Sequence, residues 1–105
     1  MLKINLEYRK GILFVRLKGD LTKYTYECLE EYLIPVISKH GIKYLVYNLE
    51  AVTIMDNYGK ASLKKGVAAA KKNAGEGFLC HAKKTLQNEF KVFENELAAL
   101  TELQI

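Results

Sequence analysis

The sequence predicts an α/β domain in which a mixed sheet of four to five strands packs against three to four helices. Two N-terminal segments alternate apolar and polar residues, as half-buried strands do. Two amphipathic segments with helical spacing follow, near residues 26–40 and 57–74. An apolar stretch between them, residues 42–49, is typical of a strand buried on both faces. Strand and helix patterns that alternate in this way favour an α/β domain.

The first two strands are predicted at residues 2–8 and 13–18. Residues 9–11, Arg-Lys-Gly, favour a turn between them. We therefore expect a β-hairpin that ends at Gly19-Asp20.

The first helix is expected to begin at Thr22 or Thr25, since both are suitable N-cap residues. Apolar residues recur at helical spacing over residues 28–37, and Gly41 is a suitable C-terminal stop. Pro35 lies inside this helix and is expected to kink it, because proline has no backbone N–H.

The third strand is expected at residues 42–49, parallel to the second because a helix long enough for a crossover connects them. Residues 50–59 are expected to form an irregular link. Asp56 or Asn57 is the expected N-cap of the second helix, which Gly75-Glu76-Gly77 ends. A fourth strand is expected at residues 78–81.

The last 25 residues allow two interpretations. By period alone, the apolar residues from Leu86 to Leu100 form one long amphipathic helix. The alternative is a short helix at residues 83–89, a strand near residues 90–94 and a final helix from Asn95. The ambiguity therefore covers residues 84–104.

Length and composition indicate a single domain over residues 1–105. No apolar run approaches the roughly 20 residues of a membrane span, and the N-terminus does not resemble a signal peptide. The two cysteines, Cys28 and Cys80, are expected to be buried thiols in a reducing compartment. We therefore expect a cytoplasmic protein.

The net charge of +4 is unevenly distributed. Residues 60–84 contain seven lysines and one glutamate, whereas residues 85–105 contain one lysine and four glutamates. The chain has only two arginines, Arg9 and Arg16, although arginine is the main residue of direct base readout. We therefore interpret the lysines as a solvated helix face and expect no specific nucleic-acid binding.

Residues 48–59, NLEAVTIMDNYG, resemble the signature of the STAS domain, the family of the bacterial anti-sigma-factor antagonists. That signature has a buried strand ending in N-L, an apolar link, and M-D-S-S-G at the start of a helix. Residues 15–21, VRLKGDL, resemble the family's R-L-x-G-x-L segment. The resemblance runs from about Ile4 to Gly77, continues through the fourth strand, and loosens beyond it.

The resemblance implies a STAS-like fold and a non-catalytic protein-interaction module. Members of this family bind an anti-sigma factor that is also a serine/threonine kinase, and regulate transcription by partner switching. Phosphorylation of a serine in D-S-S-G breaks the complex. A serine in the first helical turn suits this role, because a helix N-terminus tolerates the added negative charge.

The motif departs from the family at the acceptor position, where Tyr58 replaces the phosphoserine and Asn57 the serine before it. We therefore expect that the usual serine switch is missing. Ser62 and Thr53 are the candidate substitutes for phosphorylation. Tyr58 is open to two interpretations: an interface residue, since tyrosines are enriched at binding hot spots, or a cover for the core beneath the link.

The predicted partner-binding face borders the carboxyl ends of the second and third strands, which parallel topology brings to one edge. The same crevice leaves open an alternative function, a STAS-like domain that binds a small ligand, nucleotide or lipid. The sequence contains no recognisable catalytic, metal or cofactor motif, and we expect a monomer or weak dimer. The predicted contact residues are Asp20, Thr22, Tyr24, Asp56, Asn57, Tyr58, Gly59, Lys60 and Ser62.

Overall fold

A computed structural model of the protein describes residues 1–103, in which five strands form one mixed sheet and three α-helices flank it. Gln104 and Ile105, the end of the predicted domain, lie outside the described residues. In chain order, the elements are β1 (Lys3–Arg9), β2 (Ile12–Leu21), α1 (Tyr26–His40), β3 (Tyr44–Met55), α2 (Asn57–Lys72), β4 (Glu76–Cys80), a 3₁₀ turn (Lys84–Leu86), β5 (Lys91–Phe93) and α3 (Glu96–Glu102).

The strands lie in the order β1-β2-β3-β4-β5. β1 and β2 form the expected antiparallel hairpin, and β3, β4 and β5 each run parallel to the strand before them. The expected parallel arrangement of β2 and β3 is therefore confirmed. It brings the carboxyl ends of β2 and β3 to the same edge of the sheet.

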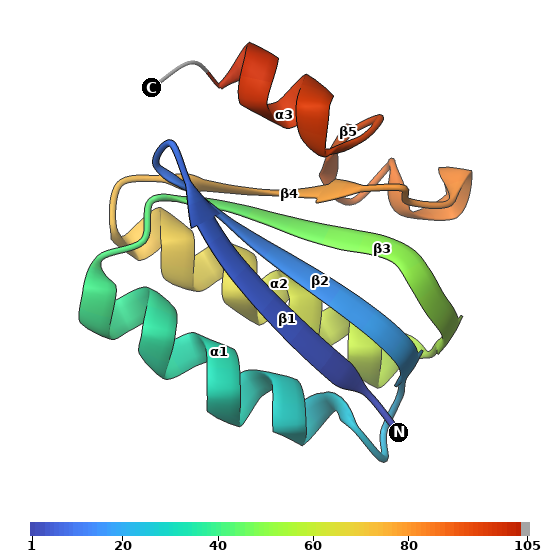
Figure 1. Ribbon diagram of the computed structural model, residues 1–105. Helices are drawn as coiled ribbons and strands as arrows, with labels where there is room; N and C mark the ends of the chain where they lie inside the picture. Colours follow the sequence, from blue (N-terminus) through green and yellow to red (C-terminus); the bar gives the residue numbers. More distant parts are fainter. Residues whose placement is uncertain (104–105) are drawn as a thin grey trace.

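The sheet separates two apolar cores. α1 and α2 cover one face, and the shorter α3 lies on the opposite face (Figure 1). The larger core lies beneath α1 and α2 and includes Leu33, Tyr47 and Leu63. The smaller core lies beneath α3 and includes Phe14 and Ala99. The alternation of side chains along β2 supplies both cores, because successive residues point to opposite faces of a sheet.

The expected helix boundaries agree with the structure in three places and differ in one. Gly41 ends α1 in the left-handed conformation, with φ of 61°. Asp56 is the N-cap of α2. Thr25 occupies the N-cap position of α1, but its side chain makes no capping hydrogen bond there. α1 continues through Pro35, whereas α2 ends at Lys72, before the predicted glycine stop.

The prediction of an irregular link at residues 50–59 was wrong, because only Asp56 lies between β3 and α2. β3 continues to Met55 and pairs with β2 as far as Leu21. Register shifts near Lys18 and Gly19 interrupt the regular alternation, and a β-bulge of this kind hides the strand period in the sequence. β2 likewise extends past the predicted end at Gly19-Asp20.

The C-terminal segment adopts the divided arrangement rather than one long helix. A 3₁₀ turn precedes the short strand β5, and α3 starts with Asn95 as its N-cap. The Asn95 side chain accepts a hydrogen bond from the backbone N–H of Ala98 at 2.8 Å. A cap at this position favours a separate helix, since an asparagine in a helix interior competes with the helical hydrogen bonds.

The cysteine prediction was half right. Cys80 is buried in the smaller core, but Cys28 is exposed on the first turn of α1. Both are free thiols. Helical spacing places Cys28 one residue before the buried Leu29, on the edge of the apolar stripe rather than in its centre.

Candidate functional site

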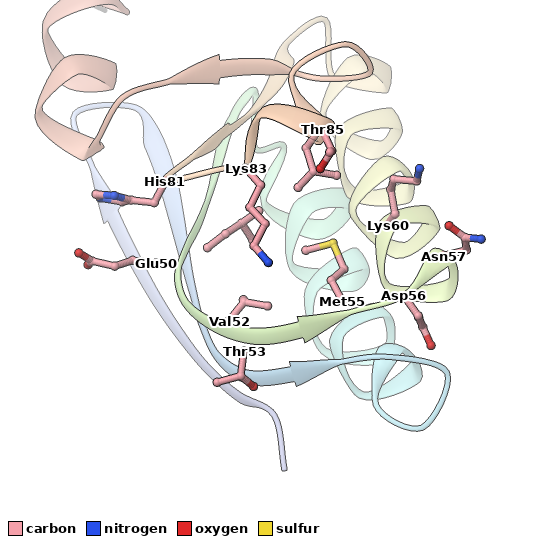
Figure 2. Close-up of a pocket in the computed structure, with 12 residues that line it drawn as sticks. Glu50, Val52, Thr53, Met55, Asp56, Asn57, Lys60, His81, Lys83 and Thr85 are labelled. Carbon is pink, nitrogen blue, oxygen red and sulfur yellow. The ribbon is translucent and has the colours of Figure 1, made fainter.

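The candidate site lies at the sheet edge where the β2–α1 loop, the end of β3 and the first turn of α2 meet. Figure 2 shows Thr53, Asp56 and Asn57 along this junction, beside a hollow. The junction brings together the three segments that the sequence predicted for the site. It is built around one carboxylate.

Asp56 links the three segments through backbone contacts. One carboxylate oxygen accepts a hydrogen bond from the N–H of Gly59 at 3.0 Å, and the other accepts from the N–H of Lys23 at 2.8 Å. The backbone N–H of Asp56 donates to the carbonyl of Leu21 at 3.3 Å. Desolvation alone would raise the pKa of this carboxyl, but the backbone N–H groups around it outweigh that effect and hold its pKa below the usual value. Asp56 therefore positions the site.

Gly59 is required by the close packing of α2 against the end of β2. It is buried, and a Cβ atom added here would collide with the backbone carbonyl and side chain of Leu21. Gly59 therefore cannot contact a partner directly. It allows the first turn of α2 to lie against the sheet edge.

Tyr58 points away from the core and is 55% exposed. Its ring contacts that of Tyr26, with the ring centroids 5.6 Å apart and the planes tilted by 35°. This geometry falls within the range of favourable aromatic pairs. A side chain that is more than half exposed contributes little to covering the core, so the exposure argues against the core-cover interpretation of Tyr58.

Two more large side chains are exposed on the same three segments. Tyr24, in the β2–α1 loop, is 83% exposed, and Ile54, near the end of β3, is 58% exposed. The ammonium group of Lys23 lies 5.1 Å from the centroid of the Tyr24 ring, within the range of a cation–π contact. Each of the three segments therefore carries one large exposed side chain.

The polar side chains of the β2–α1 loop mostly shape the loop. The Thr53 hydroxyl donates to the Asp20 carboxylate at 2.7 Å, across the paired ends of β3 and β2. The Thr22 hydroxyl accepts a hydrogen bond from the backbone N–H of Tyr24 at 3.3 Å. Thr25 accepts from the N–H of Thr22 and donates to the carbonyl of Asp20.

Ser62 does not face solvent, although the sequence suggested it both for the contact surface and for phosphorylation. It is 1% exposed, and its hydroxyl faces the carbonyl of Tyr26 across the α1–α2 interface at 3.5 Å. The packing of α2 against α1 explains the burial, because the Ser62 side chain lies between the two helices. A kinase cannot reach this hydroxyl in the folded protein.

Lys60 contacts the C-terminal segment as well as solvent. Its ammonium group lies 2.8 Å from the Glu89 carboxylate, and Lys64 lies 2.7 Å from the other oxygen of the same group. Hydrogen bonds from these two lysines lower the pKa of Glu89 to about 2. Two lysines of α2 therefore hold the segment between β4 and β5 through Glu89.

A hollow of about 400 Å³ lies beside the junction. Figure 2 shows its wall formed by the end of β3, the start of α2 and the segment after β4. Apolar side chains such as Val52 and Met55 line it together with the cationic Lys60 and Lys83. This mixture could accept a small anionic ligand.

Sequence reasoning missed Ile54, Lys23 and Glu89. The exposure of Ile54 could have been predicted, because neighbouring residues of an extended strand point to opposite faces and Met55 is half-buried. Lys23 contributes its backbone N–H to Asp56, which no side-chain pattern reveals. Glu89 contacts Lys60 across 29 residues, and such a contact depends on the divided C-terminal fold.

The described residues offer little for catalysis. Within residues 1–103, no three His, Cys, Asp or Glu side chains form a group that could hold a metal ion. Burial is the main reason that the pKa of the Cys80 thiol is raised to about 12, so this thiol is not a thiolate nucleophile at neutral pH. Over the same residues, no helix combines the length and apolar character needed to cross a membrane.

Comparisons with known proteins converge on one family. The family model of the STAS domain matches residues 3–96. An anti-sigma F factor antagonist from Paenibacillus polymyxa is 26% identical in an alignment of 113 positions, which covers 99% of this chain and 97% of that protein. The unphosphorylated anti-sigma factor antagonist SpoIIAA has the same fold, with a TM-score of 0.82 at 18% identity over 97% of this chain and 98% of that chain. The phosphorylated Bacillus cell fate determinant SpoIIAA gives a TM-score of 0.76 at 19% identity, covering 96% and 99% of the two chains.

Proposed function

Because the chain belongs to the STAS-domain family, we propose that it acts as an anti-sigma-factor antagonist, binding an anti-sigma factor of the serine/threonine-kinase type through the N-terminal end of α2. The antagonist from Paenibacillus polymyxa, which matches nearly the whole chain, supports this function. The binding surface comprises the exposed side chains of Tyr24, Ile54, Asn57 and Tyr58. This surface is positioned by the hydrogen bonds of Asp20, Thr22 and Asp56 and by the close packing of Gly59.

The observation that carries the proposal is the exposure of Tyr58 in the first turn of α2. The resemblance to the STAS signature implies that the phosphorylated serine of the family falls at this position. A tyrosine there keeps a side chain within reach of a partner, but its hydroxyl lies across an aromatic ring, several ångströms further from the backbone. We infer that the protein binds its partner without being released by phosphorylation at this position.

Neither candidate substitute replaces the missing serine well. Ser62 is buried against α1. Thr53 is exposed, but its hydroxyl donates to the Asp20 carboxylate. A phosphate on Thr53 would place about −1.5 to −2 charges against that carboxylate, and would push apart the ends of β2 and β3.

The test uses the kinase-type anti-sigma factors encoded in the same genome. Each is incubated with the protein and ATP, and binding and intact mass are measured together. We expect one of them to bind with the mass of the protein unchanged. The Tyr58→Ser variant lacks the ring but restores an acceptor, so we expect it to bind more weakly before ATP is added, then to gain one phosphate and lose the remaining binding.

Two results would overturn this proposal. Failure of every such anti-sigma factor to bind would reject the antagonist function. A wild-type protein that is phosphorylated at Thr53 and released would reject the absence of a switch. Thr53→Val, which keeps the shape of the side chain and removes the hydroxyl, identifies that case.

A second candidate function is small-ligand binding in the hollow beside β3, favoured by its lysine side chains. Lys60 and Lys83 would favour a phosphate-bearing ligand, such as a nucleotide. A rise in melting temperature with ATP or GTP, abolished in Lys83→Ala, would support this function. Binding of nucleotide together with failure to bind any anti-sigma factor would favour it over the first.

A further inference from the structure

The outer edge of β1 has no strand paired with it among residues 1–103. Within these residues, β1 lies at the end of the strand order and pairs only with β2. Figure 1 shows β1 as the outermost strand of the sheet, with α1 covering one face beneath it. Proteins usually protect such an edge by making it short, by a β-bulge, by proline or by charged side chains. β1 has seven residues, no proline and an unbroken register with β2, and its charged side chains, Lys3, Glu7 and Arg9, are of both signs.

The hairpin geometry determines which backbone groups face outward. The turn residues Lys10 and Gly11 both have positive φ, 51° and 83°, as the favoured two-residue hairpin turn requires. Such a turn is closed by a hydrogen-bonded pair, which here is Arg9 and Ile12. Because hydrogen-bonded positions alternate along an antiparallel ladder, the N–H and C=O groups of the even-numbered residues of β1 face the open edge.

We propose that this edge pairs with the β1 edge of a second copy of the chain, in antiparallel register centred on Asn5. In this register, Ile4 lies opposite Leu6 of the second copy, and both have outward backbone groups that can exchange two hydrogen bonds. Two five-stranded sheets then become one continuous sheet. The proposal concerns the sheet edge and is independent of the surface at α2.

Charge selects this register. Lys3 lies opposite Glu7 of the second copy, whose carboxylate also pairs with Arg16 of its own chain at 2.8 Å. Because the dimer is symmetric, the contact occurs twice. These are non-hydrogen-bonded positions, where opposing side chains come closest. A shift by two residues one way would place Lys3 opposite Arg9, a repulsive contact. A shift the other way would place Lys3 opposite Asn5 and lose the ion pairs.

The apolar face of β1 agrees with the same register. Leu2, Ile4 and Leu6 are only partly covered by the larger core, and Tyr8 on the same face is 61% exposed. Pairing centred on Asn5 places Leu2 opposite Tyr8, so that apolar side chains meet along the whole contact. The edge is therefore self-complementary on both faces.

Sedimentation velocity of the full chain, from micromolar to millimolar concentration, tests the proposal. We expect a reversible dimer. Lys3→Glu places glutamates opposite each other, and Glu7→Lys does the same with lysines. Each variant alone is expected to weaken the dimer by about tenfold or more. An equimolar mixture of the two variants restores both ion pairs, so it is expected to form a heterodimer.

Circular dichroism and urea unfolding of each variant exclude loss of fold as the cause. Hydrogen exchange supplies a second measurement, because the amides of Ile4, Leu6 and Tyr8 become protected only in the dimer. A wild-type protein that stays monomeric at all concentrations would overturn the proposal. So would a dimer that neither the charge reversals nor their mixture affects.

Discussion

The two ends of α2 are built by the same means and differ in what they expose. At the N-terminal end, the side chain of Asp56 ties the helix to the β2–α1 loop. At the C-terminal end, the side chain of Asn73 links it to α1 and to the loop before β3, donating to the carbonyls of Ile37 at 3.1 Å and Ile42 at 2.8 Å. Each end also has a glycine, Gly59 or Gly75, packed closely against a backbone carbonyl.

The two ends differ in the exposed side chains around Asp56 and Asn73. Near Asp56, the large side chains of Ile54 and Tyr58 are held in solvent. Near Asn73, the exposed neighbours are Lys71 and Lys72, which are ordinary for a soluble surface. The C-terminal end of α2 therefore stabilises the fold, whereas the N-terminal end stabilises the fold and also presents exposed side chains to a partner. Substitutions at the two ends should separate these effects.

The largest expected effect comes from the two close-packed glycines. In Gly75→Ala a Cβ would collide with the Lys43 carbonyl, and in Gly59→Ala with the Leu21 carbonyl. We expect each variant to lower the free energy of unfolding by about 3 kcal/mol, measured by urea denaturation. Gly41→Ala is the control, because it has positive φ but nothing within 4 Å of the added atom. Losses no greater than that of Gly41→Ala would contradict the packing argument.

The next effect is specific to the C-terminal end. Asn73→Ala leaves two carbonyls without their side-chain donor and is expected to cost about 2 kcal/mol of unfolding free energy. Binding of the anti-sigma factor should not change. Asn57→Ala, at the exposed start of the helix, is the matched control and should stay within about 0.5 kcal/mol of wild type. If Asn73→Ala weakens binding as well, the two ends are not separable.

The N-terminal end should depend on acid pH, because the pKa of Asp56 is lowered in the folded protein. A lowered pKa contributes stability above the unfolded value of about 3.9, and this contribution is lost as the pH falls through the folded value. The stability difference between wild type and Asp56→Asn should therefore shrink as the pH falls below about 4. Thermal unfolding of both proteins across this range measures it; a constant difference would argue against the carboxylate's role.

The smallest expected effect on stability is at Tyr58. Tyr58→Ala removes one exposed ring and its contact with Tyr26, so it should cost at most about 1 kcal/mol. Urea denaturation of Tyr58→Phe beside it tests whether the ring contact is responsible, since Phe keeps the ring. A loss of several kcal/mol in Tyr58→Ala would show that this side chain covers the core after all.

Much of the fold could be predicted because local pattern and tertiary structure agree. The hairpin, α1 and the buried part of β3 each have the period that their burial requires. The Asp56 cap was also predictable, since the side chain contacts a backbone group only three residues away. These elements are specified by neighbours in the sequence.

The remainder depends on contacts between distant residues. The end of β3 is a strand because β2 lies beside it through a bulged register. Glu89 reaches Lys60 only after the chain has turned past β4. Ser62 appeared available because a hydroxyl in a helix carries no sign of which neighbour it faces, and here it faces α1. Burial of this kind is set by helix packing and not by local period.

The dissociation constant of the anti-sigma-factor complex, measured for two tyrosine variants, tests whether the protein binds its partner through the N-terminal end of α2. Tyr58→Ala changes the N-terminal end of α2, and Tyr32→Ala removes a tyrosine of similar exposure, 52%, from the middle of α1. We expect the constant to rise by at least about 30-fold for Tyr58→Ala, as at a binding hot spot, and to stay unchanged for Tyr32→Ala. Equal effects of the two substitutions, or no effect of Tyr58→Ala, would contradict binding through the N-terminal end of α2.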